Sequence, residues 1–345
     1  MPLKSRNLIL FSLILDFLNF QALCLIISKL PTIKNMSTNP TKPGGIYSPV
    51  LTPFNTDGSP DSDRFVKHCR WLIDQDVGLA IFGTNSEANS LTVGEKHKLL
   101  DALIDAKIPV SRLMPGTGAC ALGDAIELTK HAVQAGCGGV LMLPPFYYKG
   151  VSEEGLYRAF ATVIDSVADE RLRVYLYHIP PVSGVPIPLP LIARLLKAYP
   201  KAIAGIKDSS GDWNNTSAML KEFQPHGFDV FAGSENFLLA NMRGGGAGCI
   251  TATGNVNPGP IVQLYKTWQE TSADEQQAKL DATRAAFAQF PMIPAMKAAI
   301  AWKTGRHDWD TVRPPLIELS TTQVKLLEES LTKVNFDMPK ASSLI

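Results

Sequence analysis

The feature that most constrains the fold is a regular alternation of eight short apolar runs with longer stretches of helical periodicity. The apolar runs span residues 46–51, 79–82, 111–114, 139–143, 173–177, 203–206, 229–231 and 248–251. Helical patterns separate them, for example at residues 63–74, 94–106, 124–135, 153–167, 189–198 and 234–242. Strands that alternate with helices in this way form βαβ units and a parallel sheet. Eight such units predict an α/β fold of the closed (β/α)₈ TIM-barrel type. No G-x-G-x-x-G motif follows the first strand, which argues against a dinucleotide-binding sheet.

The chain continues well beyond the eighth apolar run. Three more helical patterns follow, at residues 275–290, 293–303 and 322–334. A proline-rich turn at Arg313–Leu316 separates the last two, and we expect the helices to pack on the barrel as an extension. The sequence therefore predicts three parts: an N-terminal tail at residues 1–44, the barrel at residues 45–256 and a C-terminal helical extension at residues 257–345.

The N-terminal tail contains a long apolar stretch at residues 8–27 that resembles a signal peptide or a membrane anchor. Asp16 lies inside this stretch, where an acidic residue costs about 3 kcal/mol in a bilayer, and no small-x-small cleavage site follows. A polar linker that begins at Met36 leads into the first strand. We expect Met36 to be the true start and residues 1–35 to come from gene prediction. A genuine anchor or organelle-targeting segment is the alternative, and only then would the protein contact a membrane.

The composition is that of a globular protein with a large core, with 45% hydrophobic and 19% charged residues. The formal net charge is +1 and no segment carries a block of like charge, so nucleic acid is not an expected partner. The five cysteines are scattered, no C-x-x-C pair occurs, and no histidine stands at ligand spacing. These patterns favour reduced thiols in a cytoplasmic protein and support neither a disulfide framework nor a metal site.

Polar residues follow several of the predicted strands at the point where each strand ends. In barrel enzymes the active site lies at the carboxyl ends of the strands, so these residues predict a small-molecule site. Turn chemistry alone also places glycine, asparagine and serine at such positions. The segments are Gly83–Glu87, Gly116–Gly118, Tyr177–His178, Lys207–Gly211 and Gly233–Glu235.

Lys207 is the leading catalytic candidate because it closes the apolar strand at residues 203–206 and faces the predicted site. A lysine in a region of low dielectric loses its charge readily, and its neutral amine attacks carbonyl groups. The alternative is a strand-end lysine whose amine extends into water. Tyr177 closes the neighbouring strand, where a phenol can relay protons. The alternative is a core tyrosine with a satisfied hydroxyl. His178 points to the opposite side of that strand and is expected to be structural.

Thr84 and Asn85 lie in a glycine-started turn that we expect to open a helix. Backbone N–H groups at the amino end of a helix favour a carboxylate, and the threonine hydroxyl adds a donor. A simple helix cap is the alternative. Farther along the chain, Tyr147 and Tyr148 form an aromatic loop that fits core packing, a lid or a subunit contact.

Residues 45–320 resemble the dihydrodipicolinate synthase / N-acetylneuraminate lyase superfamily of pyruvate-handling class I aldolases. The resemblance rests on the order and spacing of several motifs over most of the chain. They are Ser48–Phe54 (SPVLTPF), Gly83–Glu87 (GTNSE), Glu154–Tyr157 (EGLY), Tyr175–Pro180 (YLYHIP), Gly205–Asp208 (GIKD) and Arg313–Leu316 (RPPL).

The resemblance implies a role for each candidate residue. Lys207 matches the family's Schiff-base lysine, Tyr177 its proton-relay tyrosine, and the Thr84–Asn85 turn its holder of the substrate carboxylate. A second tyrosine, which reaches across a subunit interface in many members, corresponds to Tyr148, and a main-chain contact on the last strand falls near Ile250. Members are commonly dimers of dimers, so a homotetramer is implied, with a homodimer as the alternative.

Two departures from the family pattern bear on the substrate. Ser86 stands where the family turn usually has glycine, which reshapes the carboxylate pocket. Val182 stands where dihydrodipicolinate synthases carry an arginine that holds the carboxylate of the aldehyde substrate, and its loss disfavours aspartate semialdehyde. The Thr84–Asn85 turn instead resembles that of 4-hydroxy-2-oxoglutarate and 2-keto-3-deoxy-sugar-acid aldolases.

The resemblance thus implies a Schiff-base aldolase or lyase that joins or separates pyruvate and an aldehyde. No metal, nucleotide or organic cofactor is expected. The alternatives are 4-hydroxy-tetrahydrodipicolinate synthase, a sugar-acid dehydratase and a non-catalytic paralogue that binds 2-keto acids. Retention of both Lys207 and Tyr177 speaks against the paralogue, because a pure binder needs no nucleophile.

Overall fold

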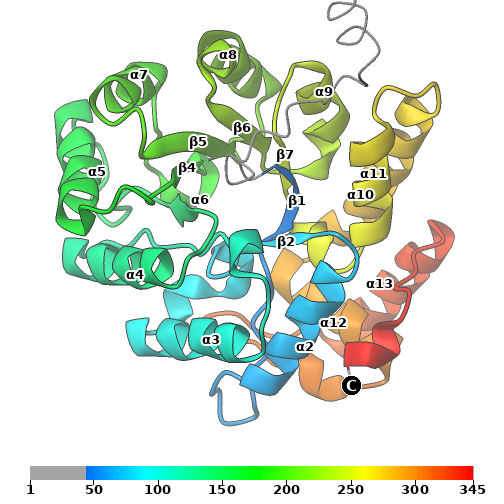
Figure 1. The fold of residues 1–345 in the computed structure, drawn as a ribbon. Coiled ribbons are helices and arrows are strands. Elements are labelled where there is room, and N and C mark those ends of the chain that lie inside the picture. The colour runs from blue at the N-terminus through cyan, green and yellow to red at the C-terminus, as the bar shows by residue number, and fades with distance from the viewer. Residues whose placement is uncertain (1–43, 345) are drawn as a thin grey trace, which may run out of the picture. The chain divides into compact units, whose positions relative to one another are not determined.

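The computed structural model describes residues 44–344 and contains one parallel sheet at its centre (Figure 1). Adjacent strands follow the order β2-β1-β7-β6-β5-β4-β3, and every pair is parallel. The strands are β1 (Gly45–Ser48), β2 (Gly78–Leu79), β3 (Val140–Met142), β4 (Val174–His178), β5 (Ile203–Asp208), β6 (Asp229–Ala232) and β7 (Gly248–Ile250).

The third predicted strand closes the barrel, although its pairing is too irregular to form a strand of its own. Leu113 forms an isolated parallel bridge with Leu79 of β2, and Gly116 forms another with Leu141 of β3. Pro115 lies between the two bridges and has no N–H to donate, which limits regular pairing. The segment therefore fills the gap between β2 and β3, and the predicted (β/α)₈ barrel is confirmed.

A ring of helices surrounds the strands (Figure 1). The helices are α2 (Ser62–Ile73), α3 (Val93–Asp105), α4 (Leu122–Gln134), α5 (Glu153–Val167), α7 (Leu189–Ala198), α8 (Trp213–Phe223), α9 (Leu238–Arg243) and α10 (Pro258–Thr267), with a short α6 (Pro180–Ser183) after β4. Side-chain oxygens of Asp61, Thr92 and Ser152 accept N–H bonds at the amino ends of α2, α3 and α5, as helix N-caps do. These caps explain why the helices start where they do.

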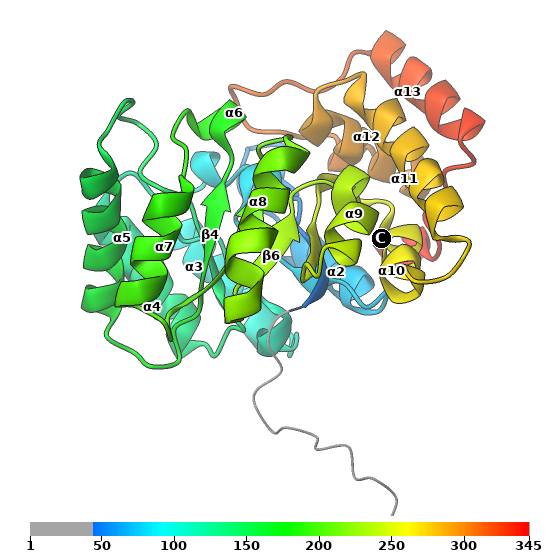
Figure 2. The same cartoon turned by 90° about the horizontal axis from the view of Figure 1, so that it is seen from above.

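The predicted C-terminal helices are present as α11 (Ala273–Ala288), α12 (Met292–Thr304) and α13 (Thr321–Lys333). Figure 2 shows them grouped beside α9 and α10, and α11 contacts both of those helices. The division of the chain at residue 256 stays a prediction, and α10, just beyond it, packs against β1. No helix among the described residues is long and apolar enough to cross a membrane, and the apolar stretch at residues 8–27 lies outside them.

The interior of the barrel is filled by side chains and leads directly to the carboxyl ends of the strands. Its buried members are Tyr47, Ala80, Met114, Leu141, Tyr175, Tyr177, Ala204, Phe231 and Ile250. Because side chains alternate along a strand, Tyr175 and Tyr177 both face this interior while His178 faces the helices. Tyr177 therefore lies at the carboxyl-end side of the packed barrel interior.

Candidate active site

Lys207 lies near the carboxyl end of β5, in register with Tyr177 of β4 and Phe231 of β6. Its residue surface is only 3% exposed. The Nζ atom lies 4.2 Å from the centroid of the Tyr177 ring, within the range of a cation–π contact. The predicted nucleophile and the predicted proton relay are therefore neighbours, set side by side by strand register.

Tyr177 connects Lys207 to the turn that follows β2. Its hydroxyl lies 3.0 Å from the Thr84 hydroxyl oxygen, a hydrogen bond in which either group can donate. Thr84 comes from a part of the chain far from β4, and the curvature of the barrel brings the two together. The structure thus places three of the predicted site residues in one contiguous chain of contacts.

The Thr84–Asn85 turn differs from the expectation in one respect. We expected it to open a helix, but residues Thr84–Ser86 form a single 3₁₀ turn and α3 begins only at Val93. Glu87 stops the helix because it adopts a left-handed backbone with φ 54° and ψ 36°. Within residues 44–344, the amide N–H groups of Thr84 and Asn85 donate to no protein acceptor, so both remain available to a ligand.

A pocket of about 640 Å³ opens above these residues. Thr84, Asn85, Tyr177 and Lys207 all line it, as predicted for a small-molecule site at this end of the barrel. The remaining lining residues are Ile179, Val182, Asp208, Ser209, Gly211, Gly233, Ser234, Asn236, Phe237, Ala252, Arg284, Ala285, Ala288 and Met292. The last four belong to α11 and α12, so the C-terminal helices form one wall of the pocket.

Two predicted residues lie outside the pocket of this chain. Ile250 is fully buried within β7, and Ala252, two residues later, lines the pocket instead. Tyr148 is 74% exposed and makes an edge-to-face contact with Tyr147. The roles of both residues stay predictions, since the resemblance assigns Tyr148 to the site of a neighbouring subunit.

His178 occupies the structural position expected from strand alternation. Its Nδ1 atom accepts a hydrogen bond of 2.9 Å from the backbone N–H of Ile187. Its Nε2 atom lies 4.0 Å from a carboxylate oxygen of Asp208. Burial lowers the pKa of His178, and the Asp208 carboxylate opposes this shift in part. The imidazole lies outside the pocket, and its bond to Ile187 fixes the segment that follows β4.

Arg284 is a charged pocket residue that sequence reasoning missed. It comes from α11, and its Nη1 atom lies 3.1 Å from Oε2 of the buried Glu235 and 3.3 Å from the Thr251 hydroxyl. Glu235 also accepts hydrogen bonds from the hydroxyls of Thr251 and Thr253. An arginine in an alanine-rich helix gives no local sign that it faces a site, because only the packing of α11 on the barrel places it there.

No cluster of three or more histidine, cysteine, aspartate or glutamate side chains in residues 44–344 has a metal-binding arrangement. The pocket does contain a primary amine, a phenol and a hydroxyl in contact with one another, from Lys207, Tyr177 and Thr84. Together these groups can attack a carbonyl and move protons.

Comparison with known proteins identifies the family. The profile of the dihydrodipicolinate synthetase family matches residues 42–334. The chain belongs to this family. Enzymes of the dihydrodipicolinate synthetase family are class I aldolases and lyases, and this chain is an enzyme of that type. The resemblance seen in the sequence motifs is thereby confirmed.

Relatives and solved structures cover almost the whole barrel and extension. An uncharacterized DapA-like lyase of Chloroflexus aurantiacus is 34% identical over 296 residues, 85% of this chain and 97% of that one. The crystal structure of dihydrodipicolinate synthase from Agrobacterium tumefaciens is 29% identical, with a TM-score of 0.77 over 85% of this chain and 99% of that one. YagE, a prophage protein of this family from Escherichia coli K12 in complex with pyruvate, is 29% identical, with a TM-score of 0.78 over the same shares.

Proposed function

We propose that the chain is a Schiff-base aldolase that forms or cleaves a carbon–carbon bond between pyruvate and an aldehyde, with Lys207 as the nucleophile. The observation that carries the proposal is the convergence of a buried lysine, a tyrosine and a threonine in one pocket. Lys207 Nζ lies 4.2 Å from the Tyr177 ring, and the Tyr177 hydroxyl is bonded to Thr84. A solved relative in complex with pyruvate supports pyruvate as the keto acid.

The reaction follows from the chemistry of these side chains. The neutral amine of Lys207 attacks the keto carbon, and the resulting carbinolamine loses water to give an iminium. As the C3–C4 bond breaks, its electron pair moves into the iminium to form an enamine, and the C4 hydroxyl loses its proton as the aldehyde leaves. The enamine is then protonated at C3, and hydrolysis releases pyruvate and the free lysine. Tyr177 lies close enough to carry these protons, with Thr84 as its hydrogen-bond partner.

The carboxylate of the keto acid has a binding place beside Lys207. Thr84 and Asn85 line the same pocket, and their amide N–H groups donate to no acceptor among the described residues. Hydrogen bonds from amides to a carboxylate are charge-assisted. A carboxylate held there is fixed relative to the amine that attacks the adjacent carbon, which removes much of the entropic cost of the encounter.

None of these steps needs a metal or an organic cofactor, so we expect turnover to survive treatment with a chelator.

Borohydride reduction in the presence of pyruvate tests the proposal. We expect a stable adduct on the intact protein, detected by mass spectrometry, and peptide mapping should place it on Lys207. Reduction without pyruvate serves as the control for nonspecific labelling. A folded protein that gives no adduct with pyruvate or other 2-keto acids would contradict the Schiff-base mechanism.

The aldehyde half of the substrate is proposed to be that of 4-hydroxy-2-oxoglutarate or a 2-keto-3-deoxy sugar acid. Val182 lines the pocket where the resemblance places the arginine of the synthases, and it offers no partner to a second carboxylate. The second candidate is 4-hydroxy-tetrahydrodipicolinate synthase, the name of several relatives. It is favoured by Arg284, which lines the same pocket and carries a guanidinium, a group that can hold a carboxylate.

Replacing Arg284 by methionine tests whether this residue binds the aldehyde half of the substrate and not the pyruvate half. We expect kcat/KM for the complete substrate to fall about 10- to 100-fold, the loss of one hydrogen bond to a charged group, while pyruvate trapping stays unchanged. Release of pyruvate is measured from 4-hydroxy-2-oxoglutarate and from a 2-keto-3-deoxy sugar acid, alongside synthesis from pyruvate and aspartate semialdehyde. The same change at Arg243, which pairs with Asp274 on the surface, is the matched control. Unchanged kinetics in a folded Arg284 variant would remove this residue from the substrate site.

A further inference from the structure

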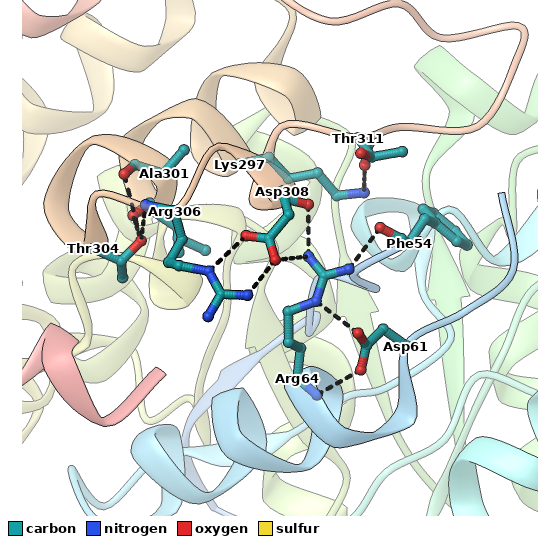
Figure 3. A network of polar contacts seen from close by, with 10 residues as sticks. Phe54, Asp61, Arg64, Lys297, Ala301, Thr304, Arg306, Asp308 and Thr311 are labelled. Atoms are coloured by element: carbon teal, nitrogen blue, oxygen red, sulfur yellow. Dashed lines mark hydrogen bonds and ion pairs between the residues drawn. The ribbon is translucent and has the colours of Figure 1, made fainter. Parts of the chain in front are cut away.

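A buried ion pair joins the C-terminal helix α12 to the turn that carries Thr84 and Asn85. The Nζ atom of Lys297 lies 2.6 Å from Oε1 of Glu87. It donates a second hydrogen bond of 2.7 Å to the backbone oxygen of Thr311, which Figure 3 shows. The side chains of Lys297 and Glu87 are 0% and 1% exposed. The pair is therefore shielded from water and from dissolved salt.

Glu87 is held from a second direction as well. Its Oε2 atom accepts a hydrogen bond of 2.8 Å from the backbone N–H of Arg313, in the segment that follows α12. Its backbone is left-handed, a conformation that residues other than glycine adopt at a cost. Glu87 is two residues from Asn85, so the contacts that fix its carboxylate also fix the path of the turn beside the pocket.

The groups around Lys297 determine the pH at which its amine carries a charge. Its Nζ atom lies 4.5 Å from the centroid of the Phe54 ring, and Figure 3 shows Arg64 reaching the backbone oxygen of Phe54 from α2. Burial lowers the pKa of Lys297 to about 8. The carboxylates of Glu87 and Glu318 oppose this shift, and the guanidinium of Arg64 adds to it. The ammonium is therefore present at neutral pH and is lost as the pH rises through about 8.

We propose that Lys297 is a positioning residue that, through Glu87, sets the Thr84–Asn85 turn for the carboxylate of the 2-keto acid. Lys297 does not line the pocket, so it acts through the turn and does not touch the substrate. The inference rests on the proposed function, because it assigns the turn to the keto-acid carboxylate. It gives the C-terminal extension a role in substrate capture in addition to its wall of the pocket.

The test measures borohydride trapping of pyruvate over a range of pyruvate concentrations in the Lys297→Met variant. We expect the half-saturating concentration to rise about tenfold or more, since a small displacement of a binding group is costly, while the limiting extent of trapping stays unchanged. Lys303→Met is the matched control, because Lys303 lies on the same helix but contacts Trp302 and Asp337 away from the pocket. Equal half-saturating concentrations in both variants and the unaltered chain would overturn the inference.

The pH dependence separates positioning from a general structural defect. Above about pH 8 the unaltered chain also loses the ammonium of Lys297. The half-saturating pyruvate concentrations of the unaltered chain and of Lys297→Met are therefore expected to differ strongly at neutral pH and less at higher pH. A difference that is constant with pH, or a fall in the limiting extent of trapping alone, would mean that the pair serves only the fold.

A double variant guards against misfolding. Lys297→Met leaves Glu87 buried without its partner, and removing one member of a buried pair is strongly destabilising. Glu87→Gln combined with Lys297→Met removes both charges, so we expect it to recover the melting temperature but not the low half-saturating concentration. Recovery of both would overturn the inference. Absence of any pyruvate adduct on the unaltered chain would instead overturn the proposed function, and the inference with it.

Discussion

Replacing Lys207 by methionine is expected to lower turnover by at least about 10⁴-fold and to abolish the pyruvate adduct, because no other group in the mechanism can form the iminium. Methionine matches the length of the lysine stem, and Lys207 is almost fully buried, so the fold should be retained. Turnover is measured as pyruvate released, and the adduct by mass spectrometry after borohydride reduction. Lys201→Met, at an exposed position just before β5, is the matched control.

A second substitution at the same position distinguishes a nucleophile from a fixed charge. Lys207→Arg places a permanent cation beside the Tyr177 ring but supplies no neutral amine, because an arginine stays protonated in proteins. We expect this variant to be as inactive as Lys207→Met. Substantial turnover in the arginine variant would mean that the residue acts electrostatically, which would contradict the Schiff-base mechanism.

Much of the fold was predictable because buried parallel strands and amphipathic helices have strong sequence signatures. The bounds of α5 and α7 match the predicted helical patterns, since apolar periodicity is clear in both segments. Residues 111–114 were predicted as a strand, but this segment and the residues after Pro115 form only isolated bridges. The local pattern is apolar enough for a strand, but a residue without an N–H cannot complete regular pairing.

The Thr84–Asn85 turn shows where local reasoning fails. A glycine followed by small polar residues and a glutamate is a reasonable helix start, yet the helix is interrupted by the left-handed Glu87. The partner that holds Glu87 in place is Lys297, more than 200 residues later in the chain. No local window contains both residues, so sequence periodicity cannot reveal this tertiary contact.

The candidate site was predictable to the extent that strand ends define it. Lys207 and Tyr177 lie at the ends of apolar strands, and the barrel brings such ends together by its topology. Arg284 enters from a C-terminal helix whose packing on the barrel no motif reveals. Tyr148 is exposed in a single chain, so its predicted role depends on a neighbouring subunit.

Replacing Tyr177 by phenylalanine is expected to lower kcat by about 10²- to 10⁴-fold, the range for loss of a general acid–base group. The ring that contacts Lys207 remains, and only the hydroxyl bonded to Thr84 is removed. Because Lys207 is untouched, the pyruvate adduct should still form, but more slowly. Rates of adduct formation and of pyruvate release are measured side by side.

Tyr175→Phe is the control for that experiment, because Tyr175 lies on the same strand and faces the same interior. Its hydroxyl is bonded to Asp229 and lies outside the pocket, so its loss should affect stability without affecting kcat. Equal kcat in Tyr177→Phe and the unaltered chain would show that water or another side chain carries the protons. The contacts among Lys207, Tyr177 and Thr84 would then position the substrate without taking part in proton transfer, and the nucleophile alone would define the chemistry of the pocket.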